Sequence, residues 1–278
     1  MQLISPTKVF KGNNAWQNSI PEILKVTNSP LLVGRSLKTK SLRQKISIEL
    51  KQEGLNVSSA ELFYDCCYED LERLNEFVMT HQCDAIIAAG GGKVLDAGKL
   101  LANSLSLPCI TVPLSAATCA GWTALANIYS KTGKFIKDIS LDSCPNILVY
   151  DHTFIQTAPK NTLTSGIADS LAKWYESSIT SSSNNDGIVQ QAIQISRVLR
   201  DQLFINGVEA YNNPCEKNLA WKNIIEANGI TAGLVGGIGG VKCRTAAAHA
   251  VHNAITQLEP KNKPLHGEIV GVGILIQL

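Results

Sequence analysis

The stretch Asp84–Leu101 constrains the fold of this chain more than any other part of the sequence. It opens with the apolar run Ile86–Ala89, which has the length and branching of a buried strand. The triple glycine Gly90–Gly92 follows, and glycine lets a backbone turn sharply and approach a ligand closely. From Lys93 onward, apolar residues recur at helical spacing. The stretch therefore predicts a strand, a glycine loop and a helix in succession.

The glycine loop is a candidate phosphate-binding site. It lies at a helix N-terminus, where free N–H groups and the helix dipole favour an anion. We expect Asp96 in the first turn of this helix, where a carboxylate also suits the dipole. The loop is neither a G-x-G-x-x-G motif nor a P-loop, because no Gly-Lys-Ser/Thr closes it. A plain tight turn between strand and helix is the alternative interpretation.

The pattern of the chain changes near residue 158. Before it, short apolar runs alternate with helical patterns, which predicts βαβ units and a parallel sheet whose ligands bind at the carboxyl ends of the strands. Expected strands cover 31–33, 60–64, 109–112 and 147–150, expected helices cover 41–51 and 71–79, and 126–129 and 135–139 form a hairpin. After it, only helical patterns follow, at 163–178, 189–211, 219–234 and 246–255. We thus expect an α/β domain over 1–158 and an all-α domain over 159–278.

The last ten residues, Ile269–Leu278, form an apolar run without a cap, a glycine stop or a charged tail. We therefore expect the sequence to be cut short inside a helix. An apolar surface that lacks its packing partner drives association, so we also expect a homo-oligomer.

The composition excludes several classes of partner. Of the 278 residues 45% are hydrophobic and 17% are charged, and the net charge of +2 with no basic stripe argues against nucleic acid. No apolar run reaches membrane-spanning length and no signal peptide begins the chain, so we expect no membrane partner. Eight cysteines, none in a C-x-x-C pair, are expected to be reduced thiols of a cytoplasmic protein.

The helical half carries a possible metal constellation of one carboxylate and three imidazoles. Asp169 lies mid-helix among apolar residues, where a carboxylate needs a partner. His249 and His252 are three residues apart and share a helix face, and His266 begins the last apolar run. A carboxylate with imidazoles suits zinc. From spacing alone this is a weak pattern, because a lone histidine in a helix is more often an ordinary core or surface residue.

Five motifs resemble the glycerol dehydrogenase branch of the iron-containing alcohol dehydrogenase superfamily. They are GGGKVLDAGK at 90–99, TALANIYS at 123–130, GIADSLAKWYES at 166–177, AAAHAVHNAIT at 246–256 and LHGEIVGVG at 265–273. The resemblance implies a dinucleotide-binding α/β domain, a helical domain and an active site in the cleft between them. It also implies that Asp169, His249 and His266 hold a catalytic divalent metal, with His252 as their neighbour.

The resemblance also assigns cofactor and substrate positions. The residues expected at NAD or NADP are Arg35, Gly90, Gly91, Gly92, Lys93, Asp96, Thr118, Thr123, Leu125 and Tyr129. Arg35 stands where relatives have a ribose-binding aspartate, and Leu114 and Ala117 stand where Thr and Ser are frequent. Cys119 replaces an aspartate that helps to bind glycerol, so we expect Cys119 and Trp122 at the substrate and place glycerol itself in doubt.

The implied function is that of a metal-dependent NAD(P) alcohol or polyol dehydrogenase, with hydride transfer from a metal-bound alkoxide to nicotinamide. His252 is the candidate for passing the proton to water. Zinc is expected rather than iron or another divalent metal, because Lys173 stands where iron-using members carry a further histidine ligand.

Two alternatives remain open from the sequence. One is a sugar-phosphate cyclase resembling 3-dehydroquinate synthase, which needs a group of basic side chains for its substrate phosphate. Near the histidines only Lys242, Arg244 and Lys261 could serve. The other is a non-catalytic nucleotide-binding relative, suggested by the replaced cofactor positions.

Overall fold

The computed structural model describes residues 2–181, 183–258 and 264–278. The chain divides into two compact units, and each contains parts of the chain that are distant in sequence. The α/β unit consists of Pro6–Leu114 and Ala124–Thr157, and the helical unit consists of Met1–Ser5, Ser115–Thr123 and Ala158–Leu278. A single cut near residue 158 therefore does not reproduce the division, because two early segments group with the helices.

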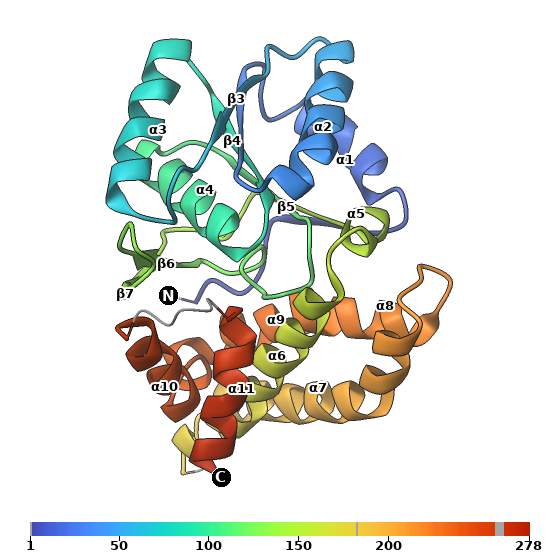
Figure 1. The fold of residues 1–278 in the computed structure, drawn as a ribbon, viewed down its shortest axis with the longest axis vertical. Helices are drawn as coiled ribbons and strands as arrows, with labels where there is room; N and C mark the ends of the chain where they lie inside the picture. The colour runs from blue at the N-terminus through green and yellow to red at the C-terminus, as the bar shows by residue number, and fades with distance from the viewer. Residues whose placement is uncertain (1, 182, 259–263) are drawn as a thin grey trace. The chain divides into compact units, whose positions relative to one another are not determined.

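The α/β unit contains a parallel sheet of six strands in the order β1-β8-β5-β4-β2-β3 (Figure 1). The strands are β1 (Lys8–Gly12), β2 (Pro30–Gly34), β3 (Ser58–Glu61), β4 (Ala85–Gly90), β5 (Cys109–Pro113) and β8 (Ile147–Asp151). A separate antiparallel hairpin joins β6 (Leu125–Tyr129) to β7 (Phe135–Ser140), as the sequence predicted. The helices of this unit are α1 (Ala15–Ile23), α2 (Lys40–Gln52), α3 (Tyr68–His81), α4 (Gly92–Leu105) and α5 (His152–Gln156).

Alternate side chains of the central strands pack against helices on opposite faces of the sheet. Ile87 and Ala89 of β4 belong to a core cluster that includes Trp16 of α1, Ile46 of α2 and Phe154 of α5. On the opposite face β4 packs against α4, where a Cβ on Gly98 would lie 2.4 Å from that of Ala88. A strand buried on both faces reads as a continuous apolar run, which is why β4 and β5 were readily predicted.

The strand order contains a topological switch. Taken in chain order, β2, β3, β4, β5 and β8 form the doubly wound arrangement 2-1-3-4-5, with β2 beside β4 at the point of reversal. Ligands of such sheets bind beyond the carboxyl ends of the strands at this point. Those ends are Gly34 and Gly90, so the glycine loop and Arg35 flank the expected crevice.

Three elements of this unit were not predicted. β1 is an edge strand whose residues are mostly exposed, so it shows no continuous apolar run. α1 contains Pro21, which obscures its helical pattern, and α5 is only five residues long. The strand predicted at 60–64 lies earlier, at β3.

The helical unit is built from α6 (Lys160–Thr180), α7 (Gly187–Asn212), α8 (Leu219–Glu226), α9 (Ala232–Gly239), α10 (Ala247–Thr256) and α11 (His266–Gln277) (Figure 1). α11 packs against α6 and α10 around a small core of Ala172, Ala248, Val270 and Ile274. The helix predicted over 219–234 is interrupted by a π-helical turn at Ala227–Thr231. Such turns are frequent at functional sites. Here Asn228 donates from Nδ2 to Ala116 O at 3.1 Å and so holds the early segment Ser115–Thr123.

One stretch of the described residues, Leu219–Cys243, is long and apolar enough to cross a membrane by length and composition. The expectation that no stretch reaches this length was therefore wrong. However, 61% of its most apolar window is buried inside the fold, as for a core helix.

Candidate metal centre and cofactor loop

Three helices of the helical unit bring the predicted metal ligands together. Asp169 comes from α6, His249 from α10 and His266 from the first turn of α11. One ligand atom from each residue lies within 4.8 Å of the others. Asp169 Oδ1 lies 3.4 Å from His249 Nε2 and 3.3 Å from His266 Nε2. Gly267 allows α11 to approach α6 closely, because a Cβ at this position would clash with the backbone of Ser165. The N–H of Gly267 donates to Ser165 Oγ at 3.0 Å.

These separations fit ligands that share a cation. Ligand atoms about 2.0–2.1 Å from a tetrahedral metal lie about 3.3–3.4 Å from one another. Asp169 is 4% exposed, and its Oδ1 accepts no hydrogen bond of ordinary geometry from the described residues. Burial alone would raise the pKa of Asp169, but the imidazoles of His249 and His266 outweigh burial and hold this pKa well below its usual range. The carboxylate is therefore ionised and available as a ligand.

Glu176, which the sequence analysis did not single out, orients His249. Its Oε2 lies 2.6 Å from His249 Nδ1, and its Oε1 accepts the backbone N–H groups of Ala246 at 2.7 Å and His249 at 2.9 Å. A carboxylate can only accept here, so Nδ1 carries the proton and the Nε2 lone pair faces Asp169. Burial raises the pKa of Glu176, but the hydrogen bonds from His249 and Ala246 outweigh burial, and the net pKa is lowered.

His266 has an equivalent arrangement with His252. His266 Nδ1 lies 2.9 Å from His252 Nε2, and His252 Nδ1 lies 2.9 Å from Asn253 Oδ1. The amide oxygen only accepts, so His252 Nδ1 donates to it and His266 Nδ1 donates to His252 Nε2. Burial and the adjacent His266 lower the pKa of His252 to about 4. The Nε2 that would accept a proton in the predicted catalytic role is thus already engaged with His266.

Lys173 lies one helical turn after Asp169 and is almost fully buried. Its Nζ donates to Arg244 O at 3.4 Å. Burial lowers the pKa of Lys173, but the electrostatic interactions with Cys119, Asp169 and Glu176 outweigh burial, and the net pKa is raised. A protonated ammonium has no lone pair, so Lys173 is not a metal ligand in this state.

The predicted substrate residues lie in the segment Ser115–Thr123 of the helical unit. Cys119 is partly exposed. Trp122 is buried over Gly233, and its Nε1 donates to Ile4 O at 2.9 Å. The indole therefore anchors the segment, while the Cys119 thiol retains some access to solvent.

The segment Ser115–Thr123 also contains two residues predicted to bind the cofactor, Thr118 and Thr123, and both are partly exposed. Thr118 Oγ1 accepts the N–H of Ala120 at 3.3 Å, which stabilises the turn that leads to Cys119.

The glycine loop has the predicted form. Gly90 ends β4, Gly91 is the extended N-cap residue of α4, and Gly92 is its first helical residue. A Cβ on Gly90 would lie 2.7 Å from Val94, so only glycine fits there without displacement. The first turn of α4 is thus presented at the carboxyl edge of the sheet, as a phosphate site requires.

Asp96 does not lie where the sequence analysis expected it. α4 begins at Gly92, so its first turn contains no acidic residue. The Asp96 carboxylate is buried, pairs with Lys99 Nζ at 3.1 Å and accepts the N–H of Asn127 at 3.3 Å. Lys99 Nζ also donates to Leu125 O. Asp96 and Lys99 together fasten the β6–β7 hairpin to α4.

Lys93 and Tyr129, both expected at the cofactor, lie near each other. Lys93 Nζ is 5.4 Å from the centre of the Tyr129 ring and forms an ion pair with Asp65. Lys93 is exposed at the first turn of α4, so it accompanies the N–H groups offered by the glycine loop.

Arg35 is exposed directly after β2. The neighbouring loop is held by Arg43, whose guanidinium lies over Gly34, donates to Ser36 O at 3.0 Å and pairs with Glu61 at 2.7 Å. Arg35 therefore projects from a supported loop next to the switch point.

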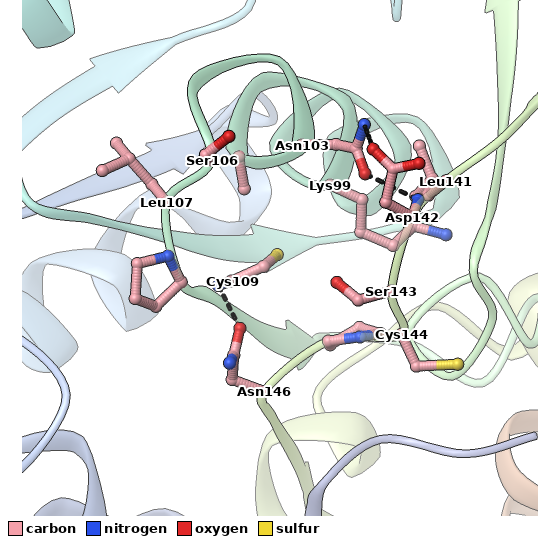
Figure 2. A pocket seen from close by; sticks show the side chains of 13 residues that line it. Lys99, Asn103, Ser106, Leu107, Cys109, Leu141, Asp142, Ser143, Cys144 and Asn146 are labelled. Atoms are coloured by element: carbon pink, nitrogen blue, oxygen red, sulfur yellow. Dashed lines mark hydrogen bonds between the residues drawn. The ribbon is translucent and has the colours of Figure 1, made fainter. Parts of the chain in front are cut away.

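Two cavities of the α/β unit are lined by none of the predicted site residues. The first, of about 360 Å³, lies at the amino ends of β5 and β8, on the sheet edge opposite the glycine loop (Figure 2). Figure 2 shows Asn103 hydrogen-bonded to Asp142, and Asn146 beside Cys109. The second, of about 860 Å³, lies between α2, β3 and α3. Neither cavity lies at the switch point beyond the carboxyl ends of the strands, where nucleotides bind to such sheets.

Comparison with known proteins agrees with the geometry. Residues 6–152 match the family model described as "Iron-containing alcohol dehydrogenase". An uncharacterised oxidoreductase of Synechocystis sp. is 43% identical over 99% of this chain and 70% of its own length. The glycerol dehydrogenase of Escherichia coli O6:H1 is 32% identical over 99% of this chain and 76% of its own length. The crystal structure of glycerol dehydrogenase from Schizosaccharomyces pombe superimposes with a TM-score of 0.84 at 29% identity, covering 99% of this chain and 71% of that one.

These matches do not favour the sugar-phosphate cyclase or the non-catalytic relative. Of the basic side chains considered for the cyclase, Lys242 is exposed, Arg244 is partly buried and Lys261 lies outside the described residues. The chain belongs to the iron-containing alcohol dehydrogenase family, in its glycerol dehydrogenase-like branch.

Proposed function

We propose that this chain is a metal-dependent, NAD(P)-linked dehydrogenase of a small alcohol or polyol. The observation that carries the proposal is the set Asp169, His249 and His266, whose ligand atoms converge in a buried place. Both histidines donate their Nδ1 protons elsewhere, so two Nε2 lone pairs and a carboxylate oxygen face one another. Such an arrangement needs a cation to be stable.

A divalent metal held by this set supplies Lewis-acid polarisation of the substrate oxygen and lowers the pKa of its hydroxyl group. The residues of the chain have complementary tasks. Glu176 and His252 fix the orientation of the two ligating imidazoles. If His252 also accepts the substrate proton, its Nε2 must first be released from His266 Nδ1.

In the α/β unit, the glycine loop and the first turn of α4 bind the diphosphate of the dinucleotide, with Lys93 beside them. The nicotinamide itself carries out the redox chemistry. Arg35 selects between the cofactors, because an exposed guanidinium next to the adenosine ribose favours the 2′-phosphate of NADP.

Zinc is the proposed metal. Three protein ligands leave one open position, as in catalytic zinc sites, and the separations of 3.3 and 3.4 Å suit tetrahedral coordination. Lys173 occupies the place, one turn after Asp169, from which a fourth ligand could come. Lys173→His should therefore raise iron binding relative to zinc, measured by elemental analysis after loading with both ions; an unchanged ratio contradicts this explanation.

The substrate is proposed to be small. It is bound without the aspartate that helps relatives to bind glycerol, because Cys119 stands in that place and its thiol is only a weak hydrogen-bond donor. The test is elemental analysis of the purified chain, followed by turnover of simple alcohols, polyols and 2-hydroxy acids with either cofactor. We expect about one metal per chain and reduction of NAD(P) by at least one alcohol. Absence of stoichiometric metal, or metal-loaded protein without turnover on any alcohol, would refute the proposal.

A further inference from the structure

Glu176 is 1% exposed, and its carboxylate makes three short contacts to a single element. All three go to the start of α10. Oε1 accepts the N–H groups of Ala246 and His249, and Oε2 accepts Nδ1–H of His249. The helix has no cap of its own, because its N-cap residue is Ala246. Glu176 therefore takes the place of the missing cap from another helix.

We propose that Glu176 is a positioning residue for the metal centre, which fixes the proton of His249 on Nδ1 and thereby presents Nε2 to the metal. This inference rests on the proposed function, since it concerns the same metal site. It goes beyond that function by assigning the tautomer of one ligand, and the start of the helix that carries it, to a single carboxylate.

The chemistry requires two acceptor oxygens in one side chain. The backbone N–H groups occupy Oε1, and the imidazole occupies Oε2. Glutamine has one oxygen and one NH₂ group of nearly the same shape. If its oxygen stays with the backbone, its NH₂ group faces Nδ1 and favours the tautomer with the proton on Nε2, which blocks coordination. If it turns round, its NH₂ group faces two N–H donors. In both cases the metal site is weakened.

Ser177 provides a matched control on the next position of α6. It is also fully buried, and its hydroxyl contacts Lys173 O and Ser196 Oγ rather than His249. Ser177→Ala therefore removes buried hydrogen bonds from the same helix without touching a ligand. If Glu176 were merely structural, Glu176→Gln and Ser177→Ala would behave alike.

The experiment measures the Kd for zinc of the full chain by competition with a chromophoric chelator, and the melting temperature without metal. We expect Glu176→Gln to weaken zinc binding about 10–100-fold, the usual effect of removing such a partner. Ser177→Ala should melt at a lower temperature but bind zinc within about twofold of the unmodified chain. Glu176→Asp keeps two acceptor oxygens on a shorter side chain, so its Kd for zinc should lie between those of Glu176→Gln and Ser177→Ala. If the glutamine variant does not fold, the zinc affinity of Glu176→Asp tests the proposal instead.

A double-mutant cycle with His249→Ala separates orientation from general damage. In that background no imidazole remains to be oriented, so Glu176→Gln should change zinc binding by less than about threefold. Zinc binding by Glu176→Gln within twofold of the unmodified chain, or an equal loss in both backgrounds, would overturn the proposal. If the unmodified chain binds metal and turns over alcohols in either of those cases, only the role of Glu176 fails. If it binds no metal, the proposed function fails as well.

Discussion

The contact between α11 and α6 should tolerate an added methyl group at one glycine but not at another. Gly267 and Gly271 lie one turn apart on α11 and both face α6. A Cβ at 267 would lie 1.8 Å from Ser165 O, whereas a Cβ at 271 would lie 3.3 Å from the Cβ of Ala168. Carbon and oxygen normally approach to about 3.3 Å, so Gly267→Ala must displace the start of α11 by about 1.5 Å. Gly271→Ala needs a shift of only a few tenths of an ångström.

The expected energies follow from these distances. Overpacking costs about 1–3 kcal/mol, and the loss of the buried hydrogen bond from Gly267 N–H to Ser165 Oγ costs about 1 kcal/mol more. Gly267→Ala should therefore lower the free energy of unfolding by about 2–4 kcal/mol. At Gly271, a helix interior position, the gain of about 1 kcal/mol in helix propensity should offset the smaller clash and leave stability nearly unchanged.

The displacement should also affect the metal, because His266 is the residue before Gly267 and a metal site tolerates errors of only about 0.2 Å. Thermal unfolding should show a melting temperature about 4–16 °C lower for Gly267→Ala and about unchanged for Gly271→Ala. Zinc binding should weaken strongly only in the first variant. Equal melting temperatures and equal zinc affinities in the two variants would show that the close packing of Gly267 on Ser165 does not position His266.

Further measurements address the ligands, the cofactor and the thiols. Zinc at 100 times its Kd should raise the free energy of unfolding by about 2.7 kcal/mol. At the same zinc concentration, His249→Ala should abolish most of this gain, whereas His252→Ala should reduce it less. The opposite order would mean that the wrong histidine was chosen. If Arg35 pairs with the 2′-phosphate, NADP(H) should bind more tightly than NAD(H), less so at high salt, and Arg35→Asp should reverse the preference; equal affinities in both proteins would exclude this role. Mass spectrometry after brief alkylation of the native chain at pH 8 should find label chiefly on Cys119 and Cys215, which are partly exposed; extensive label on the other six cysteines would contradict their burial.

The α/β architecture could be predicted because its signals are local. β4 and β5 are buried on both faces and appear as apolar runs, and the glycines after β4 mark the turn into α4. β1 could not be found in this way, since it is a strand only through its pairing with β8, which lies far along the sequence. The prediction that Asp96 lies in the first turn of α4 was wrong because sequence patterns place a helix start only to within a few residues. α4 starts at Gly92, so Asp96 lies beyond the first turn and pairs with the buried Lys99.

The proposed metal ligands could be named from the resemblance, but their supporting contacts could not. The hydrogen bond of His266 to His252 joins α11 to α10, and that of His249 to Glu176 joins α10 to α6. A local signal for Glu176 does exist, because Asp169, Lys173 and Glu176 lie four and three residues apart and so share one face of α6. Charged residues at helical spacing within a run of uncharged residues, as over 161–180, indicate a buried polar face.

That charged face of α6 also explains why we expect the site to need a cation. Asp169, Lys173 and Glu176 are all almost fully buried, so two carboxylates face one ammonium inside the helical unit. Buried charges are stable only when they are balanced, and breaking such a balance is costly. Protonated imidazoles can supply the missing positive charge, since burial lowers the pKa of His249 but Asp169 and Glu176 outweigh it and raise the pKa. A divalent metal supplies the same charge without a proton, so metal and protons should compete for His249, and zinc binding should weaken as the pH falls.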